Sequence, residues 1–318
     1  MSNGFVLGCD GGNTKTIALV AAPSGEILGW GRAGSSDVHD NPAAIDELRA
    51  AVRAACAMAA CAPSQVQHAV FGLAGADWPE DYALLSEAMR TLLGGEPTIL
   101  NDAVNAIRCG TPDGVGVVVS CGTGGTAAAT GRDGTIYHRG FWPEPSGARE
   151  IGRRGLRAVQ RAHLGIDLPT ALTGLALVRY GAADPDDLLH ILTRRDRVAA
   201  ADDRWFCPDV LDAADAGDAA AVAIVRREGQ VLGEQASVCA RAVGFEQAFP
   251  LVHVGGVFRH PTRLLRDAVR AEAPQAVPVD ALWEPAAAAL LRAFDAQGVA
   301  AEDAVRGSLP EASVFATG

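Results

Sequence analysis

A short segment near the start of the sequence combines a carboxylate, a pair of adjacent glycines and two hydroxyls, groups that together can hold a phosphate. It runs Gly8-Cys9-Asp10-Gly11-Gly12-Asn13-Thr14-Lys15-Thr16 between two apolar runs. Glycines let backbone N–H groups converge on phosphate oxygens, and hydroxyls add donors without bulk. Asp10 would orient Mg²⁺ through its water molecules. The competing interpretation is a plain type I′ hairpin turn, for which Asp-Gly is also favoured.

A second glycine-rich segment, Gly122-Thr123-Gly124-Gly125-Thr126, follows the apolar run VGVVVS. By the same reasoning it would be a second phosphate clamp, whose N–H donors come from the opposite domain. A glycine-rich hairpin without a ligand is the competing interpretation. This segment alone does not decide between the two.

An acidic residue, Asp102, follows the strand-like run PTIL at the point where we expect a helix to begin. Ligands of open α/β sheets bind at such strand ends. In phosphoryl transfer to an alcohol, Asp102 would accept the hydroxyl proton while Mg²⁺ and backbone donors hold the phosphoryl group. The alternative is that Asn101 or Asp102 is only the N-cap of that helix.

A glycine pair later in the chain could receive a flat ligand. Val254-Gly255-Gly256-Val257 closes the strand-like run LVHV and precedes a helical segment. A planar base could lie against glycines because they present no side chain. Close packing between a strand and a helix would require the same residues, so both interpretations stay open.

The elements around these segments follow one repeated pattern. Apolar runs at 5–9, 16–22 and 27–31, separated by glycine-containing turns, predict a three-stranded antiparallel meander. With the helices and strands that follow, the order becomes β-β-β-α-β-α-β-α, and a similar meander begins after residue 113. We therefore predict two α/β domains, at residues 1–113 and 114–318. The periodicity after Gly298 is weak, so we expect a loosely ordered tail.

The composition limits the kinds of partner. A chain of 318 residues suits two α/β domains, and 49% hydrophobic with 20% charged residues is typical of a globular protein. A net charge of −11 argues against broad binding to nucleic acid or to anionic membranes. The sequence contains neither a membrane-spanning run nor a signal peptide, so we expect a cytoplasmic protein. The seven cysteines contain no C-x-x-C pair, which argues against a zinc site.

The ordered set DGGNTKT, GLAGADWPED, NDA, GTGGT, VGGV and P-x-x-A-A resembles the BadF/BadG/BcrA/BcrD-type ATPases and the N-acetylglucosamine kinases of the actin-like superfamily. The resemblance extends from the first apolar run to the last clear helix. It implies two actin-like, ribonuclease H-like domains around a nucleotide cleft, each with the β-β-β-α-β-α-β-α core. It also implies an ATP-dependent kinase that uses Mg²⁺ and phosphorylates a hydroxyl of a small sugar or amino sugar.

The resemblance assigns a role to each motif. Asp102 would be the general base, and Gly255 and Gly256 would contact adenosine. The residues that would bind the ATP phosphates are Asp10, Gly11, Gly12, Asn13, Thr14, Lys15, Gly122, Thr123 and Gly124, with Asp10 also at the metal.

Two departures from the family pattern concern the acceptor. The kinases usually show Gly-Asp-Glu-Gly-Ser where this chain has Trp142-Pro143-Glu144-Pro145-Ser146, and they tend to carry an Asn where it has Gly34-Ser35-Ser36-Asp37. We expect the acceptor to bind between Asp37 and Glu144 on one side and Asp102 on the other, with Trp142 covering the sugar ring. Three carboxylates around one site would favour an ammonium group over an N-acetyl group. The identity of the acceptor stays open.

Three other functions compete. An ATPase that activates a radical 2-hydroxyacyl-CoA dehydratase through a shared iron–sulfur cluster needs thiolate ligands. Such activators resemble Cys-x-x-Gly-Thr-Gly, and Cys121 is out of register with that pattern. A sugar-responsive repressor needs a DNA-binding helix pair, for which the sequence before Phe5 leaves no room. A non-catalytic binder of sugar or nucleotide stays open, although Asp102 argues for chemistry. The oligomeric state, a homodimer included, is also open.

Overall fold

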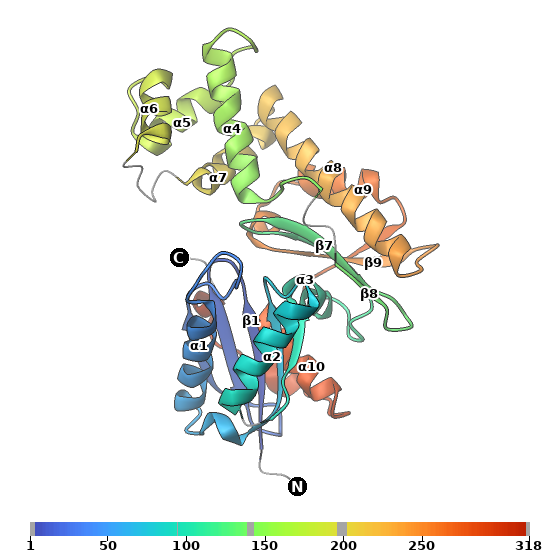
Figure 1. The fold of residues 1–318 in the computed structure, drawn as a ribbon. Coiled ribbons are helices and arrows are strands. Elements are labelled where there is room, and N and C mark those ends of the chain that lie inside the picture. The colour runs from blue at the N-terminus through green and yellow to red at the C-terminus, as the bar shows by residue number, and fades with distance from the viewer. Residues whose placement is uncertain (1–3, 94, 139–142, 196–201, 316–318) are drawn as a thin grey trace. The chain divides into compact units, whose positions relative to one another are not determined.

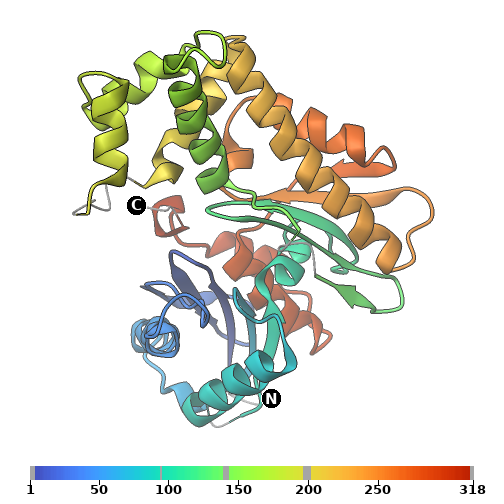
Figure 2. The ribbon, with the colours of Figure 1, turned by 45° about the horizontal axis from the view of Figure 1, so that its top comes forward.

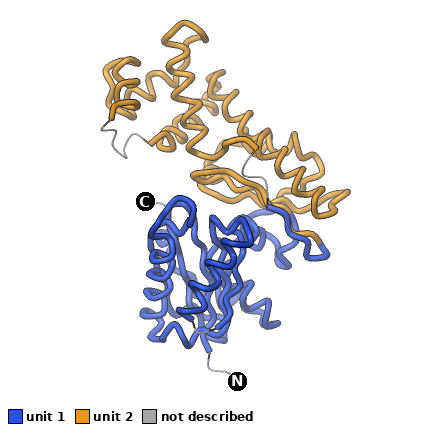
Figure 3. The backbone as a smooth tube through the Cα atoms, in the orientation of Figure 1, with its two compact units in different colours: residues 1–116, 132–138, 279–318 blue, residues 117–131, 139–278 orange. Residues whose placement is uncertain are grey.

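The computed structural model describes residues 4–93, 95–138, 143–195 and 202–315. These residues divide into two compact units (Figure 3). Unit 1 comprises the described residues within 1–116, 132–138 and 279–318, and unit 2 those within 117–131 and 139–278. The end of the chain, which the sequence pattern assigns to the second domain, is therefore grouped with unit 1.

Five strands form the sheet of unit 1, in the order β3-β2-β1-β4-β5. β1 pairs antiparallel with β2 and β2 antiparallel with β3, which confirms the predicted meander. β4 pairs parallel with β1, and β5 parallel with β4. The strands are Phe5–Gly11 (β1), Thr16–Ala21 (β2), Ile27–Ala33 (β3), Val66–Leu73 (β4) and Thr98–Asn101 (β5).

Helices cover both faces of this sheet, because successive side chains of a strand point to opposite sides. Leu7 and Cys9 of β1 lie in one core with side chains of α1 and α2, whereas Val6 lies in a second core with α10. Figures 1 and 2 show α1 and α2 on one side of the sheet and α10 on the other. The helices of unit 1 are α1 (Ala44–Met58), α2 (Pro79–Leu93), α3 (Asp102–Ala106), α10 (Pro285–Asp295), α11 (Glu302–Gly307) and α12 (Ala312–Phe315).

The approach of α10 to the sheet is unusually close. A Cβ atom on Gly8 of β1 would overlap the backbone of Leu290, so only glycine fits at that position. The helix supplies a row of alanines with Leu290 and Phe294 to the core, all fully buried. The alanine-rich face of α10 therefore packs directly on β1.

The tail after Gly298 also packs on unit 1. Val305, Val314 and Phe315 are buried in the core that α10 forms. Glu302 of α11 accepts a hydrogen bond at 2.8 Å from Arg108, whose side chain is 2% exposed. The expectation of a loosely ordered tail is thus wrong for the described residues up to 315. Its few apolar anchors are spaced too irregularly to give a periodic pattern.

The second sheet has the order β10-β9-β6-β7-β8, and β6 pairs parallel with β9. The predicted second meander and the strand LVHV are confirmed as β6 to β8 and β9, whereas β10 was not predicted. The strands are Gly116–Cys121 (β6), Gly125–Thr130 (β7), Ile136–Tyr137 (β8), Phe249–Val254 (β9) and Ala276–Val279 (β10).

Helices of unit 2 accompany the second sheet. α8 lies beside α9 in both ribbon views (Figures 1 and 2), and Gly229 and Gly233 allow the close contact, since a Cβ atom on either would meet α9. The helices are α4 (Ala148–His163), α5 (Leu172–Tyr180), α6 (Pro185–Thr193), α7 (Cys207–Asp215), α8 (Ala219–Ala242) and α9 (Leu264–Glu272).

Candidate active site

The first glycine segment connects β1 to β2. Gly12 N–H donates to the carbonyl of Lys15 at 2.9 Å, and the Gly12 carbonyl accepts from Ser36 N–H at 3.2 Å. No residue from 10 to 15 has a positive φ, whereas a type I′ turn needs two. The type I′ interpretation is therefore wrong. The segment is a loop anchored at its base, with Asn13 and Thr14 exposed.

The side chain of Lys15 is engaged within unit 1, because its Nζ donates to the carbonyl of Phe315. Lys15 is the only lysine of the chain. Any contact between Lys15 and a phosphate would have to compete with this bond, and the phosphate-binding role of Lys15 stays a prediction.

Asp10 and Asp102 are partly buried at the carboxyl ends of β1 and β5. Burial and, next, the negative charge of Asp102 raise the pKa of Asp10 to about 7. Burial raises the pKa of Asp102 to about 6, and the negative charges of Asp77 and Asp37 add to this rise. The hydrogen bond from Ala103 N–H has the opposite effect and lowers the pKa. Unit 1 therefore brings three predicted site residues, Asp10, Asp37 and Asp102, into one electrostatic cluster.

Asn101, rather than Asp102, is the N-cap of α3. Its Oδ1 accepts from Ala103 N–H at 3.0 Å, and Asp102 Oδ1 accepts from the same N–H at 2.8 Å. The bond from Ala103 N–H goes to Oδ1 and not to Oδ2 of Asp102. Because Ala103 N–H bonds only Oδ1, the carboxylate of Asp102 keeps Oδ2 as an oxygen that can accept a proton.

Two acidic residues of this cluster were not predicted. Asp77 accepts from Asn101 Nδ2 at 3.0 Å, and its Oδ1 lies 3.9 Å from His138 Nδ1. Glu284 precedes α10, and its charge also raises the pKa of Asp10. Asp77 follows the carboxyl end of β4, so the strand-end rule used for Asp102 could have found it. No local signal marks Glu284, which reaches the cluster only because α10 packs on β1.

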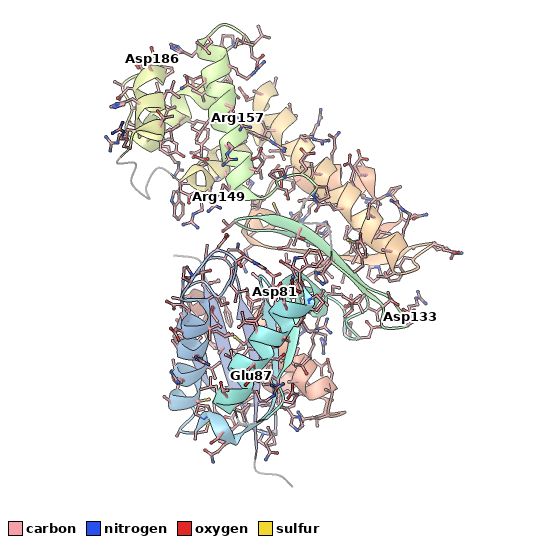
Figure 4. All side chains as sticks on the ribbon, in the orientation of Figure 1. Asp81, Glu87, Asp133, Arg149, Arg157 and Asp186 are labelled. Atoms are coloured by element: carbon pink, nitrogen blue, oxygen red, sulfur yellow. The ribbon has the colours of Figure 1, made fainter. Side chains whose placement is uncertain are left out.

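The second glycine segment is the connection between β6 and β7 in unit 2. Gly122 N–H donates to the Gly124 carbonyl at 2.9 Å. The carbonyls of Gly122 and Thr123 accept from the first N–H groups of α4, Ala148 at 2.8 Å and Arg149 at 3.2 Å. Figure 4 labels Arg149 at this end of α4. The loop is thus held by the start of a helix rather than being a free hairpin tip.

Two further glycines pack against this loop in unit 2. Gly147, with a φ of +101°, and Gly255, with a φ of +99°, both adopt a backbone conformation that favours glycine. A Cβ atom on Gly147 would overlap Gly124, and one on Gly255 would overlap the backbone of Cys121. A Cβ atom on Gly256 would meet nothing within 4 Å. The GTGG and VGG motifs therefore lie together, and the contact of Gly255 and Gly256 with adenosine stays a prediction.

The predicted acceptor residues are only partly described. Trp142 lies outside the described residues. Asp37 of unit 1 is 7% exposed, and its Oδ1 accepts from His39 N–H at 2.9 Å. Glu144 of unit 2 accepts from Arg154 at 2.9 Å and from Arg227 at 3.2 Å. These guanidinium groups offset the charge of Glu144, which weakens the reasoning that favoured an ammonium group on the acceptor.

The thiol of Cys121, next to the second loop, is fully buried, and its Sγ lies 3.7 Å from Glu228 Oε1. Burial raises the pKa of this thiol well above its ordinary value. A buried, protonated thiol is poorly suited to ligate an iron–sulfur cluster. The helices within the described ranges are all too short or too polar to cross a bilayer.

A model of the BadF/BadG/BcrA/BcrD ATPase family matches residues 7–293 of the sequence. The chain belongs to this family. Among curated proteins it is similar to the N-acetyl-D-glucosamine kinase of Dictyostelium discoideum, with 25% identity over 93% of the chain and 100% of that relative. The family match accounts for the motif order from the first glycine segment to α10.

Solved structures share the fold. A Chromobacterium violaceum protein, provisionally described as an N-acetylglucosamine kinase, superimposes with a TM-score of 0.72 at 24% identity, over 92% of this chain and all of its own. A ROK family glucokinase from Streptomyces griseus, solved with glucose and AMPPNP, gives a TM-score of 0.58 at 19% identity, over 92% of this chain and 99% of its own. The predicted two-domain, actin-like fold is therefore confirmed.

Proposed function

We propose that the chain is an ATP-dependent kinase that transfers the γ-phosphoryl group to a hydroxyl of a small sugar or amino sugar, with N-acetylglucosamine among the candidates. Membership of an ATPase family and similarity to a curated N-acetyl-D-glucosamine kinase support this proposal. The observation that carries it is the placement of Asp102, which has a protonatable oxygen at a strand end within the carboxylate cluster of unit 1.

Asp102 has the properties of a general base for this reaction. Such a base works best when its pKa lies near the working pH, and burial raises the pKa of Asp102 to about 6. An acceptor hydroxyl at Oδ2 would lose its proton to Asp102 as the oxygen attacks the γ-phosphorus. The bond between the γ-phosphorus and the bridging oxygen then breaks, and ADP leaves. The hydrogen bond that Oδ1 accepts from Ala103 N–H would keep the carboxylate in place during this step.

The residues present fit a Mg²⁺ ion. Mg²⁺ prefers oxygen ligands and usually binds through one or two carboxylates, with water and phosphate oxygens completing its shell. Asp10 offers such a carboxylate, and the charges of Asp102 and Glu284 beside it concentrate negative potential there. A bound Mg²⁺ would neutralise charge on the phosphates during transfer. Asp10 would orient the ion, and the backbone of the first glycine segment would hold phosphate oxygens.

The experiment is ADP release from Mg-ATP with a panel of sugars: N-acetylglucosamine, glucosamine, glucose and aminocyclitols. We expect at least one to stimulate release in the wild type. Asp102→Asn should lower kcat by about 10²- to 10⁴-fold, because a general base is lost, while nucleotide affinity is kept. Near-normal turnover of Asp102→Asn would refute the assigned base, and lack of stimulation by every sugar would refute the acceptor class. The cytoplasmic location stays a prediction, and the oligomeric state, a homodimer included, stays open.

A further inference from the structure

A fully buried carboxylate lies behind the second glycine segment. Glu228 is on α8, its side chain is 0% exposed, and the sequence pattern did not single it out. Its Oε1 accepts from Gly147 N–H at 2.6 Å and lies 3.7 Å from Cys121 Sγ. Burying a carboxylate costs free energy unless hydrogen bonds or opposite charges offset it. The hydrogen bond from Gly147 N–H is therefore the main direct contact that offsets the burial of this carboxylate.

Gly147 is the point at which α4 meets the loop. It is the N-cap of α4, and its backbone lies against Gly124 so closely that no side chain fits. The next two residues, Ala148 and Arg149, donate to the carbonyls of Gly122 and Thr123. A shift of Gly147 would move both of these donors, because they directly follow it in the chain.

The two donated bonds set the direction of the loop's own N–H groups. In a trans peptide the C=O and the N–H of the same unit point in opposite directions. Because the carbonyls of Gly122 and Thr123 point at α4, the N–H groups of Thr123 and Gly124 point away from it. Two successive N–H groups on one side form an anion-binding concavity.

The charge of Glu228 is only partly balanced. The Nη1 of Arg154 lies 3.9 Å from Oε2, which is beyond a hydrogen bond, and Glu150 adds negative charge nearby. Among the described residues, Oε2 has no hydrogen-bond partner. The direct contact at Gly147 is therefore better defined than the ion pair with Arg154, and we assign the effect to that hydrogen bond.

We propose that Glu228 is a positioning residue for nucleotide binding: by holding Gly147 it fixes the start of α4, and thereby aims the N–H groups of Thr123 and Gly124 at the ATP phosphates. This inference rests on the proposed function, which makes the second glycine segment a phosphate-binding loop. Glu228 itself touches neither nucleotide nor acceptor in this scheme.

Two variants of Glu228 test separately whether the length of its side chain or its negative charge matters for nucleotide binding. Glu228→Asp keeps the charge but is one methylene shorter, so its carboxylate cannot reach Gly147 N–H. Glu228→Gln keeps the reach, and its amide oxygen can still accept from Gly147, but it loses the charge. Glu234→Gln, which removes an exposed charge from the same helix, is the matched control.

The measurement is titration calorimetry with Mg-ATP and, separately, with adenosine. Leaving a buried N–H unpaired should weaken Mg-ATP binding by Glu228→Asp about 5- to 100-fold, and Glu228→Gln should stay within about 3-fold of the wild type. Adenosine affinity should be unchanged in both, because only the phosphate loop moves. The proposal is overturned by wild-type Mg-ATP affinity in Glu228→Asp, by a larger loss in Glu228→Gln than in Glu228→Asp, or by an equal loss for adenosine.

Sugar phosphorylation by the wild type is assayed in parallel, so that failure of the proposed kinase function can be distinguished from failure of the proposed role of Glu228. If no sugar is phosphorylated but the two variants differ as expected in Mg-ATP affinity, the acceptor class is wrong and the role of Glu228 stands. If a sugar is phosphorylated and both variants bind Mg-ATP like the wild type, the role of Glu228 is wrong and the kinase stands.

Discussion

The buried charge of Glu228 should make the stability of the protein depend on pH, and Glu228→Gln should remove that dependence. Burial raises the pKa of Glu228 from 4.5 to about 7, against the opposing effects of Gly147 N–H and Arg154. Between these two pKa values the folded state holds the proton while the unfolded state releases it. The contribution of Glu228 to the unfolding free energy is therefore fully present below pH 4.5, and it is lost as the pH rises through about 7.

The size of the effect follows from the shift. At about 1.4 kcal/mol per pKa unit, the wild type should lose about 2.5 kcal/mol of unfolding free energy from this group between about pH 5 and about pH 8. Glu228→Gln has no proton to release at this position. Its unfolding free energy should therefore rise relative to that of the wild type, by about that amount, over the same interval.

Urea unfolding followed by circular dichroism, at several values from about pH 5 to about pH 8, measures this difference. All other titrating groups are common to both proteins, so they cancel in the comparison. Glu234→Gln removes an exposed charge, 58% accessible, and should run parallel to the wild type. Parallel curves for Glu228→Gln and the wild type would refute the reasoning, since the charge of Glu228 would then carry no burial penalty.

Three further outcomes are expected. The kcat/KM for the sugar should fall as the pH drops below about 6, because Asp102 must be unprotonated to act and burial raises its pKa to about 6; an acid limb near the ordinary aspartate value of 3.8 would contradict this. Gly8→Ala should lower the unfolding free energy by about 1–3 kcal/mol in urea titrations, because its Cβ would overlap the backbone of Leu290, whereas wild-type stability would mean that α10 can move away. Anaerobically purified protein should be colourless, with no stoichiometric iron by metal analysis, and a brown protein would favour the dehydratase-activator function.

The parts of the site that the sequence predicts are those encoded by consecutive residues. The first glycine segment, Asp102 and the GTGG loop each combine a strand end with a short polar motif, so their surroundings could be predicted locally. Asp10, Asp37 and Asp102 do lie in one cluster of unit 1. The order of strands and helices could also be predicted, because the spacing of apolar residues that indicates each element is likewise a local property of the sequence.

The parts that could not be predicted depend on contacts between distant segments. Glu228 lies within an ordinary helical pattern, and only the packing of α8 behind the second loop brings it to Gly147. Glu284 reaches Asp10 because α10 returns to the first sheet. The partners of Glu144, Arg154 and Arg227, likewise follow from helix packing, and they change the expected charge balance.

The return of α10 to β1 has a consequence for how the chain folds during synthesis. The face of the first sheet that carries Val6, Ile17 and Leu19 is covered by α10, which the ribosome makes only after all of unit 2. About 270 residues separate Leu19 from α10, so at about 5–20 residues per second that face waits roughly 13–54 seconds for its cover. Unit 2 is nearly continuous in sequence, so it can complete its own core first although it is translated second. The nascent N-terminal part of unit 1 would then be the segment most exposed to aggregation or to chaperone binding, and a ribosome stalled before residue 285 would hold a sheet with one bare apolar face.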